Sequence, residues 1–292
     1  MAEMLWRAEG SLQHLDISPL QPLRDHSVPR LYAQHDFCKL IGAFPVAMSN
    51  APPIIIPAPE PSTTSPATII FLHGFGDDAN GWTDLVSQLH TANKLPHLKW
   101  ILPNAPENRD AMAQAWYYPK PFSPIPLPKR AGEEEEDDDE EDDEQGMMSS
   151  VEYICGLIDK EVEEGKVPPG RIVVGGFSQG CAISLLVGLL SRYKGKLGGV
   201  AGLSGYLPLS GKVRRLWSNA RQEGQSVTRW FLAHGSRDQL VPRRMFTSYR
   251  EKLGAWEGDK VEAKVYEGMA HTSSGPEIRD LCSWLEKVVP MA

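Results

Sequence analysis

The sequence predicts an α/β fold with a mostly parallel central sheet and helices on both of its faces. Between residues 67 and 290, short apolar runs alternate with segments whose apolar residues recur at helical spacing. The short runs are apolar throughout and rich in β-branched residues, as in parallel strands that are buried on both sides. An alternation of strand and helix over this length implies parallel strands joined by crossover helices.

The first part of this pattern contains two strands and one helix. ATIIFLHG (67–74) is a β-branched run that stops at a glycine, which predicts a strand. Residues 80–93 have apolar side chains three or four positions apart, which predicts a helix. LKWILP (98–103) is again short and apolar, so a second buried strand is expected there.

The second part of the pattern begins with a predicted helix at 149–165, whose apolar residues fall on one face. A strand at 171–177 and a strongly apolar helix at 179–193 follow. The remaining elements are strands at 198–207, 228–235 and 261–268, with helices at about 243–254 and 275–288.

Two segments lack this regular pattern. Residues 1–66 show no sustained period, and their proline-rich end, 45–66, resembles a linker or an edge segment. Residues 133–144 are twelve consecutive acids, EEEEDDDEEDDE. Because neighbouring like charges repel, a disordered acidic surface insert is predicted at about 123–147.

The composition allows one domain with a sizeable core and argues against a nucleic-acid partner. The 292 residues are 41% hydrophobic and carry a formal net charge of −8. This acidity is local, since twelve of the 38 acidic residues lie at 133–144 and the remaining 26 face 30 basic residues. A chain that is nearly balanced elsewhere does not suggest nucleic-acid binding.

Cysteine usage points to a reducing compartment. The four cysteines, Cys38, Cys155, Cys181 and Cys282, are far apart and show no metal-ligand spacing. No apolar run approaches the roughly 18 residues that span a bilayer, and the first residues lack the pattern of a signal peptide. We expect a cytoplasmic protein without a transmembrane segment, with the nucleus left open as a second compartment.

A nucleophilic serine is predicted at Ser178. Gly176-Phe177-Ser178-Gln179-Gly180 has the pattern Gly-x-Ser-x-Gly and lies between a predicted strand and a predicted helix. That context is the one in which a tight turn lifts a serine hydroxyl above the carboxyl edge of a sheet, while a helix N-terminus faces developing negative charge. The alternative is a glycine-rich turn with an ordinary solvent-exposed serine.

A serine hydroxyl needs a base, and the base needs an orienting acid. With this kind of turn, the acid and then the histidine follow the serine along the chain, each after a later strand. Asp238 lies three residues beyond the strand-ending Gly235, and His271 lies three residues beyond Gly268. Each has an ordinary alternative, a helix cap for Asp238 and a surface loop for His271, but their order and spacing together favour catalysis.

Two backbone N–H groups are needed to stabilise the oxyanion of an acyl-transfer intermediate. The residue after the serine, Gln179, supplies one of them. The second is expected from the loop that opens with His73-Gly74-Phe75-Gly76, directly after the first strand. His73 itself is interpreted as a buried structural histidine that binds loop backbone.

Four motifs, FLHGFGDDANGW, GGFSQGCAISL, HGSRDQLVP and VYEGMAHTSS, together resemble the acyl-protein thioesterase family, which overlaps with small carboxylesterases and lysophospholipases. The resemblance covers about residues 52–292 and implies an α/β-hydrolase fold. It implies Ser178 as nucleophile, Asp238 as orienting acid and His271 as base. The backbone N–H groups of Phe75 and Gln179 are then the oxyanion donors.

The chain departs from the family pattern in three places. Family members often begin near a stretch like MSNAPPIIIPA (48–58), so residues 1–47 are interpreted as a poorly ordered extension of a domain at 48–292, with Met48 as an alternative start. A Trp-Phe-Asp-like stretch of the family is AWYYPKPF (115–122) here, and the acidic run enlarges the same loop. We expect Trp82, Trp116 and Tyr117 to line the substrate site.

The resemblance implies a serine hydrolase that removes long acyl chains, such as palmitate, from protein cysteines, with esterase and lysophospholipase side activity. Its partners are then S-acylated proteins or lipid and ester substrates, and transient contact with a membrane surface is left open. Neither a metal nor a cofactor is called for. The alternatives are a general carboxylesterase or lysophospholipase, or a non-enzymatic acidic-tract binding protein on a hydrolase scaffold.

Overall fold

The structure is a computed structural model that describes residues 51–119, 142–219 and 226–291. Ala47–Ala292 forms a compact unit of its own, and everything below concerns this unit. The predicted extension at 1–47 lies outside the described residues, as does the predicted acidic insert up to residue 141.

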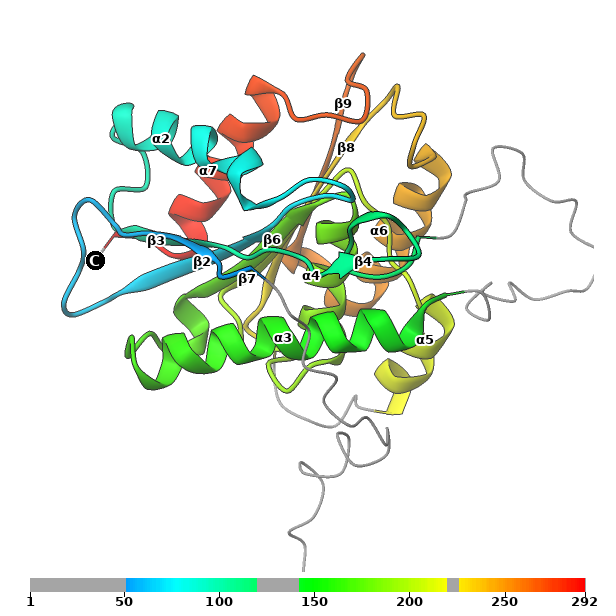
Figure 1. Cartoon of the computed structure of the whole chain (residues 1–292), viewed down its shortest axis with the longest axis horizontal. Coiled ribbons are helices and arrows are strands. Elements are labelled where there is room, and N and C mark those ends of the chain that lie inside the picture. The colour runs from blue at the N-terminus through cyan, green and yellow to red at the C-terminus, as the bar shows by residue number, and fades with distance from the viewer. Residues whose placement is uncertain (1–50, 120–141, 220–225, 292) are drawn as a thin grey trace, which may run out of the picture. The chain divides into compact units, whose positions relative to one another are not determined.

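A seven-stranded sheet in the order β1-β3-β2-β6-β7-β8-β9 forms the centre of the unit (Figure 1). Six neighbouring strands run parallel, and only β1 at the edge is antiparallel to its neighbour β3. The strands are β1 (Ile54–Ile56), β2 (Ala67–Leu72), β3 (Leu98–Leu102), β6 (Ile172–Phe177), β7 (Gly199–Leu203), β8 (Arg229–Gly235) and β9 (Val261–Tyr266). The predicted α/β fold with a mostly parallel sheet is therefore confirmed.

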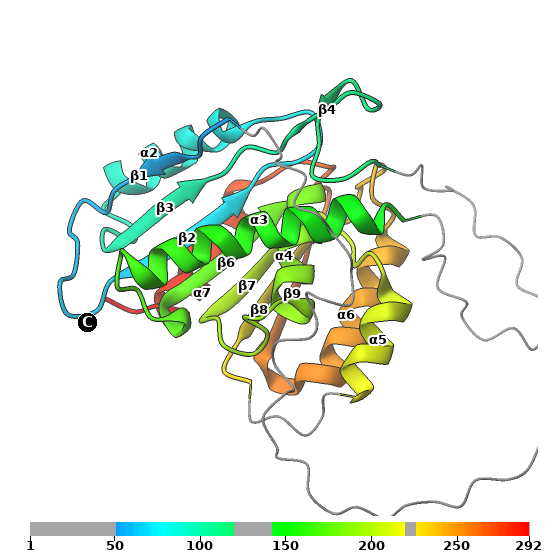
Figure 2. The same cartoon turned by 60° about the horizontal axis from the view of Figure 1, so that its bottom comes forward.

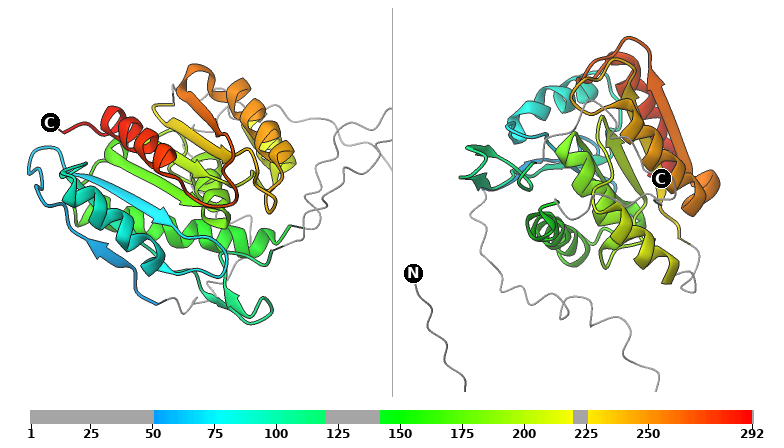
Figure 3. Two further views of the ribbon diagram at one scale, coloured as in Figure 1. Left: turned by 90° about the horizontal axis from the view of Figure 1, so that it is seen from above. Right: turned by 90° about the vertical axis from the view of Figure 1, so that its right-hand side faces the viewer.

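Helices cover both faces of this sheet (Figures 2 and 3). One face carries α2 (Thr83–Thr91) and α7 (Gly275–Val288). The other face carries α3 (Glu144–Glu163), α4 (Gln179–Leu190), α5 (Ser210–Asn219) and α6 (Arg243–Glu257).

Strand β2 shows how the sequence produces two cores. Its six residues are all buried, and successive side chains point to opposite faces. Ile70 and Leu72 pack with α3 and α4, whereas Ile69 and Phe71 pack with α2 and α7. Since both faces are covered, a strand in this position must be apolar throughout, which is the pattern that predicted it.

Several elements differ from the sequence prediction. The segment 80–93, predicted as one helix, is divided into a 3-10 turn, η1 (Ala79–Trp82), and the helix α2. The sequence did not predict the small hairpin of β4 (Glu107–Asn108) and β5 (Ala113–Gln114) or helix α5, whereas the edge strand β1 lies in the segment interpreted as a linker or an edge segment. β1 lies within the proline-rich segment, consistent with the restriction of proline to sheet edges.

Helix α3 begins at Glu144, five residues earlier than predicted, because the end of the acidic run caps it. Asp143 Oδ1 accepts a hydrogen bond from the Gly146 N–H at 2.9 Å. Asp143 Oδ2 accepts another from the Tyr118 N–H at 2.8 Å, and Glu144 pairs with Lys212 of α5. The last acids of the run are therefore part of the folded unit.

Candidate active site

Ser178 occupies the turn between β6 and α4. Its backbone has φ 55° and ψ −116°, a conformation that side-chain-bearing residues rarely adopt. Its N–H donates to the Leu203 carbonyl of β7 at 2.9 Å, and its carbonyl accepts from the Ala182 N–H at 3.2 Å. These bonds hold the turn that the Gly-x-Ser-x-Gly pattern predicted.

The two glycines of the pattern are required by backbone contacts. A Cβ on Gly176 would lie 2.5 Å from the carbonyl carbon of Gly180. A Cβ on Gly180 would lie 2.4 Å from the Leu72 carbonyl oxygen at the end of β2. The turn is thus packed so closely against β2 that only glycine fits on either side of the serine.

The structure brings Ser178, His271 and Asp238 together in one hydrogen-bonded chain. His271 Nε2 lies 3.0 Å from Ser178 Oγ, and His271 Nδ1 lies 2.8 Å from Asp238 Oδ2. With the ring proton on Nδ1, His271 donates a hydrogen bond to the Asp238 carboxylate. Nε2 then accepts a hydrogen bond from the hydroxyl of Ser178. This arrangement matches the geometry of a serine nucleophile with its base and orienting acid.

The loops after β8 and β9 bring the acid and the histidine together by direct backbone contact. The Arg237 N–H donates to the Met269 carbonyl at 2.9 Å, and the Ser236 N–H donates to the Tyr266 carbonyl at 3.0 Å. A Cβ on Gly235 would lie 2.2 Å from the Met269 oxygen, so the loops approach this closely only because residue 235 is glycine.

Asp238 is buried and held as a carboxylate. Burial acts to raise its pKa, but hydrogen bonds from His271 and from the Val241 N–H outweigh burial and lower the pKa. Oδ1 accepts from the N–H groups of Leu240 at 3.0 Å and Val241 at 2.9 Å. The other oxygen, Oδ2, remains for His271.

The N–H groups of Phe75 and Gln179 are the two that the sequence predicts as oxyanion donors. Gln179 is the first residue of α4, so its N–H has no partner within the helix. The Phe75 N–H donates to no backbone carbonyl in the described part of the chain. The preceding residue, Gly74, lies against the serine, since a Cβ there would be 3.4 Å from Ser178 Cβ.

His73 is buried and contacts the backbone of this loop, as expected for a structural histidine. Its Nδ1 lies 2.7 Å from the Gly74 carbonyl, and its Nε2 lies 3.0 Å from the Ala105 nitrogen, whose N–H it accepts. This requires the neutral ring with its proton on Nδ1. Burial lowers the pKa of His73, and the neutral ring is thereby favoured.

The side chain of Gln179 and Trp116 complete the support of the oxyanion loop. Gln179 Oε1 accepts from the Trp116 N–H, and Gln179 Nε2 donates to the Tyr117 carbonyl, both at 3.1 Å. Trp116 Nε1 donates to the His73 carbonyl at 2.8 Å. These bonds fix residues 116–117 against His73, which precedes the Phe75 loop, and against Gln179, the first residue of α4.

A cavity of about 300 Å³ opens beside Ser178 and His271. Its wall is mostly apolar, as is typical of small-molecule sites. The residues that line it are Gly74, Phe75, Asp77, Tyr117, Pro119, Phe177, Ser178, Gln179, Tyr206, Leu240, Val241 and His271.

Of the three aromatic residues expected in the substrate site, Tyr117 lines this cavity and the two tryptophans lie behind its wall. Trp116 is 1% exposed, because its indole N–H turns inward to the His73 carbonyl. Trp82 packs against Phe71 and Phe177, with ring centroids 4.6 and 5.9 Å away. These tryptophans support cavity-lining residues and do not contact its interior.

Sequence reasoning missed Tyr206, Leu240 and Val241 as parts of the cavity wall. Tyr206 follows β7 and shares a hydrogen bond with Tyr117, the two hydroxyl oxygens being 2.8 Å apart. The signal was available, because the segments after parallel strands meet at one edge of the sheet. Leu240 and Val241 belong to the loop of Asp238 and could have been included on the same ground.

The mouth of the cavity has exposed apolar side chains. Phe75 is 43% exposed and Leu240 is 67% exposed, and both line the cavity. Tyr118 is 51% exposed beside Tyr117. Met112, 90% exposed, lies on the β4–β5 hairpin, which joins the oxyanion loop through a bond from the Gly76 N–H to the Gln114 carbonyl.

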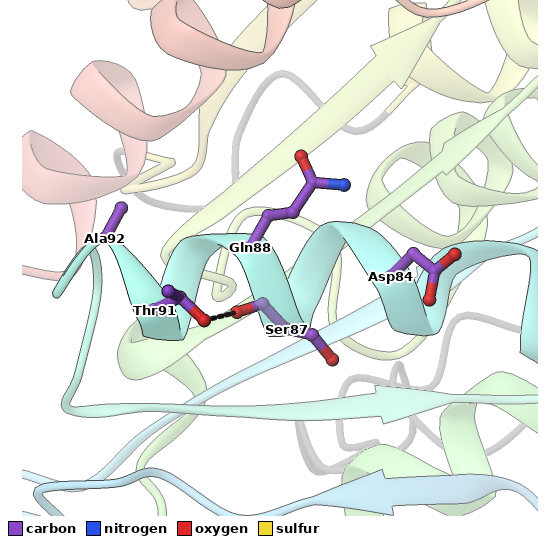
Figure 4. Close-up of a pocket in the computed structure, with 5 residues that line it drawn as sticks. All are labelled: Asp84, Ser87, Gln88, Thr91 and Ala92. Atoms are coloured by element: carbon purple, nitrogen blue, oxygen red, sulfur yellow. Dashed lines mark hydrogen bonds between the residues drawn. The ribbon is translucent and has the colours of Figure 1, made fainter.

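A second hollow, of about 370 Å³, lies on the outer surface of α2 (Figure 4). Its lining comes from this helix and the residue that follows it: Asp84, Ser87, Gln88, Thr91 and Ala92. The only bond drawn there is that of Thr91 Oγ1 to the Ser87 carbonyl, an ordinary contact within a helix. No group of three His, Cys, Asp or Glu side chains suited to a metal ion occurs in the described residues.

A doubly covered parallel sheet with a serine at a strand-to-helix elbow, and with an acid and a histidine after later strands, defines an α/β hydrolase. Solved structures of this class are similar to the chain. A crystal structure of Zea mays acyl-protein thioesterase 2 is similar with a TM-score of 0.60 and 26% identity, covering 81% of this chain and 98% of that one. The fold of esterase PE8 is also similar, with a TM-score of 0.58 at 20% identity.

The model of the phospholipase/carboxylesterase family matches residues 55–289, and the chain belongs to this family. Acyl-protein thioesterase 1 of Yarrowia lipolytica is 35% identical over 82% of this chain and 98% of its own length. Acyl-protein thioesterase 1 of Mycosarcoma maydis is 36% identical over 80% of this chain and 95% of its own length. The resemblance inferred from the four sequence motifs is confirmed.

Proposed function

We propose that this protein is a serine hydrolase that cleaves long-chain acyl thioesters from S-acylated cysteines of proteins, with esterase and lysophospholipase side activity. The observation that carries the proposal is the chain of hydrogen bonds from Asp238 through His271 to Ser178, at the wall of a mostly apolar cavity. Relatives named acyl-protein thioesterase 1, at 34–36% identity, support the substrate class.

In the proposed reaction, His271 Nε2 takes the proton of Ser178 as Oγ attacks the acyl carbonyl carbon. The Phe75 and Gln179 N–H groups hold the oxyanion, a type of interaction that typically contributes about 3–4 kcal/mol. The C–S bond then breaks, and His271 Nε2 gives up its proton to the departing sulfur or to solvent, which leaves the ring neutral for the second half of the reaction. Water, activated by His271, releases the fatty acid and restores the hydroxyl of Ser178.

The same groups can cleave oxygen esters. A thiol has a pKa of about 8.5, so a thiolate leaves with little protonation, whereas an alkoxide needs a proton from His271 as it departs. A general carboxylesterase or lysophospholipase is thus the second candidate function. It is favoured by the family to which the chain belongs, that of phospholipases and carboxylesterases.

We further propose a transient contact with membrane surfaces, through which an acyl chain that is inserted in the bilayer reaches the cavity. The exposed apolar side chains of Phe75, Met112, Tyr118 and Leu240 support it, because such groups favour an apolar surface over water. None of the helices in the described ranges has the length and apolar character to cross a bilayer. Substitution of Met112 and Tyr118, neither of which lines the cavity, by Asp is expected to weaken sedimentation with phosphatidylcholine vesicles and to leave hydrolysis of a water-soluble ester unchanged.

A cytoplasmic location, with the nucleus as a second compartment, is proposed as well. It is supported by Cys155, Cys181 and Cys282, which are buried free thiols. Free thiols are usual in reducing compartments. Fractionation of cells that express the tagged protein tests this location.

The experiment that tests the main proposal compares wild type with Ser178→Ala on a palmitoyl-cysteine peptide and on a lysophospholipid. Removal of the hydroxyl is expected to lower kcat by roughly 10⁴-fold or more on both, because the covalent intermediate cannot form. Ser87→Ala, on the exposed surface of α2, is the matched control and should retain full activity. A fluorophosphonate probe should label the wild type and the control only.

The relative rates decide between the candidate functions. A higher kcat/KM for the palmitoyl peptide supports the thioesterase, and a higher value for the lysophospholipid supports the second candidate. If neither substrate is hydrolysed and the probe labels nothing, both are wrong and a non-enzymatic scaffold with an acidic tract takes their place.

A further inference from the structure

A second histidine lies beside the orienting acid. His234, near the end of β8, has its Nε2 3.9 Å from Asp238 Oδ2, the same oxygen that lies 2.8 Å from His271 Nδ1. A distance of 3.9 Å is too long for a hydrogen bond. His234 Nε2 instead lies 3.1 Å from the Val241 carbonyl oxygen, to which it donates.

This bond closes the loop that holds the acid. Val241 donates its N–H to Asp238 Oδ1 at 2.9 Å and accepts the His234 N–H on its carbonyl. Leu240 donates a second N–H to Oδ1. One carboxylate oxygen is therefore occupied by the loop, and the other is directed at His271.

Apolar packing alone does not explain why residue 234 is a histidine. It is fully buried and stacks on Phe246, with centroids 4.9 Å apart and an interplanar angle of 15°. Its Nδ1 has no hydrogen-bond partner among the described residues. A buried nitrogen without a partner is unfavourable, so an apolar ring would pack at lower cost unless the Nε2–H is needed.

The ring is neutral, since burial lowers the pKa of His234 despite the nearby carboxylate. A neutral ring with its proton on Nε2 can hold the Val241 carbonyl without competing, as a second cation, for Asp238 Oδ2. The two histidines beside this carboxylate therefore have different partners: His234 binds the Val241 carbonyl, and His271 binds Asp238 Oδ2.

We propose that His234 is a positioning residue, whose Nε2–H fixes the Val241 carbonyl and thereby orients the Asp238 carboxylate toward His271. The inference rests on the proposed function, in which His271 is the base. Loss of this bond lets the carboxylate rotate, so that the imidazolium formed during catalysis is stabilised less well. The effect falls on kcat, because no atom of His234 lines the cavity.

The test compares His234→Gln with His234→Asn. The amide nitrogen of Gln reaches about as far as Nε2, whereas that of Asn corresponds to Nδ1 and falls short of the Val241 carbonyl. On a water-soluble p-nitrophenyl ester, the Asn variant is expected to lose roughly 10- to 100-fold in kcat with KM within about twofold, and the Gln variant to stay within about threefold of wild type.

His97→Asn is the matched control. His97 is likewise buried, binds a carbonyl through Nε2 (Val289, 2.7 Å) and has an unpartnered Nδ1 in the described structure, but it lies outside the cavity wall. It should lose stability to a similar extent and keep its kcat. Near-UV circular dichroism verifies folding, and His234→Phe, which keeps the ring on Phe246, replaces the Asn variant if that one does not fold.

A second readout is the low-field proton resonance of His271 Nδ1–H in the unliganded protein. It should persist in wild type, His234→Gln and His97→Asn, and weaken or vanish in His234→Asn. Equal kcat in all variants with an unchanged resonance overturns the proposal, as does an equal loss in the His97 control. These outcomes differ from failure of the thioesterase assignment, which would show only as inactivity of wild type on the palmitoyl peptide.

Discussion

Ser178 holds a backbone conformation that is costly for any residue with a side chain. A positive φ of this kind costs about 1–3 kcal/mol, and it persists only where the surroundings impose it. Here the Leu203 carbonyl and the Ala182 N–H hold the turn, and Gly176 and Gly180 let it pack against β2. The strain positions Oγ before any substrate arrives, which reduces the reorganisation needed during the reaction.

Gly176→Ala tests this local packing. Its Cβ would lie 2.5 Å from the Gly180 carbonyl carbon and 2.8 Å from the Leu72 oxygen, both backbone atoms that cannot move independently of β2 and α4. We expect a loss of about 2–3 kcal/mol in the free energy of unfolding, measured in urea, together with a lower kcat for ester hydrolysis.

Gly156→Ala is the matched control for this substitution. A Cβ on Gly156, within α3, would meet no atom within 4 Å. Because alanine is favoured over glycine in a helix by about 1 kcal/mol, this variant should be as stable as wild type or more so, with unchanged kcat. Equal stability of the two variants would contradict the packing argument.

The residues of the candidate site differ in how well the sequence can predict them. Ser178, Asp238 and His271 follow strands in a fixed order, so local patterns and chain order suffice to select them. Trp116 is expected in the substrate site because AWYYPKPF resembles a family stretch near the acyl groove, but a hydrogen bond to the distant His73 carbonyl turns its side chain inward. Side-chain direction depends on partners far along the chain, which no local pattern contains.

At the scale of elements, burial and contacts between distant segments decide how clearly the sequence predicts a strand or a helix boundary. Strands such as β2 and β6 are buried on both faces and therefore have long apolar runs. Edge strand β1 has only three residues, and it forms because β3 offers it hydrogen-bond partners. Helix α3 starts early because Asp143, one acid within a run of twelve, caps it.

Helix α7 begins with a capping box whose acid is buried. The Ser274 hydroxyl accepts from the Glu277 N–H, and Glu277 Oε2 accepts from the Ser274 N–H. Burial raises the pKa of Glu277 to about 7, although the Ser274 N–H opposes this shift. The other oxygen, Oε1, has no partner in the described residues, which fits a protonated carboxyl.

Glu277→Gln is therefore expected to change how stability depends on pH. The unfolded carboxyl has a pKa of 4.5 and the folded one about 7, so between these values the folded state keeps a proton that the unfolded state has lost. The contribution of Glu277 to stability then falls as pH rises through this window, by up to about 3 kcal/mol, and is level above it. Gln cannot ionise and preserves the capping box, so the variant should lack this slope in thermal unfolding.

Glu286→Gln on the same helix is the control. Its carboxylate is 47% exposed and pairs with Lys94 at 3.5 Å, an interaction worth at most about 1 kcal/mol. This substitution should leave the slope of wild type between pH 4.5 and 7 in place. If Glu277→Gln retains the slope as well, the buried carboxyl is not its source.

At the scale of the whole unit, the parallel sheet assembles the site. β2, β6, β8 and β9 all run in the same direction, so the oxyanion loop, Ser178, Asp238 and His271 follow strand ends at one edge. Every residue of the site, and both apolar cores, lie between residues 67 and 289. The described residues of the site therefore all belong to the unit Ala47–Ala292.

Two truncations test that statement. A chain that starts at Met48 retains β1, both described cores and all described site residues, so its kcat/KM for an ester and its Tm should match those of the full chain. A chain that starts at Ala58 loses β1, whose Ile54 pairs with Leu102 of β3, and also the Pro52 carbonyl that accepts from Asn104 Nδ2 at 3.0 Å. The exposed edge of β3 should lower its Tm and promote aggregation, because an unpaired strand edge accepts other chains. Loss of activity in the longer of the two truncated chains would show that residues 1–47 contribute to the folded unit.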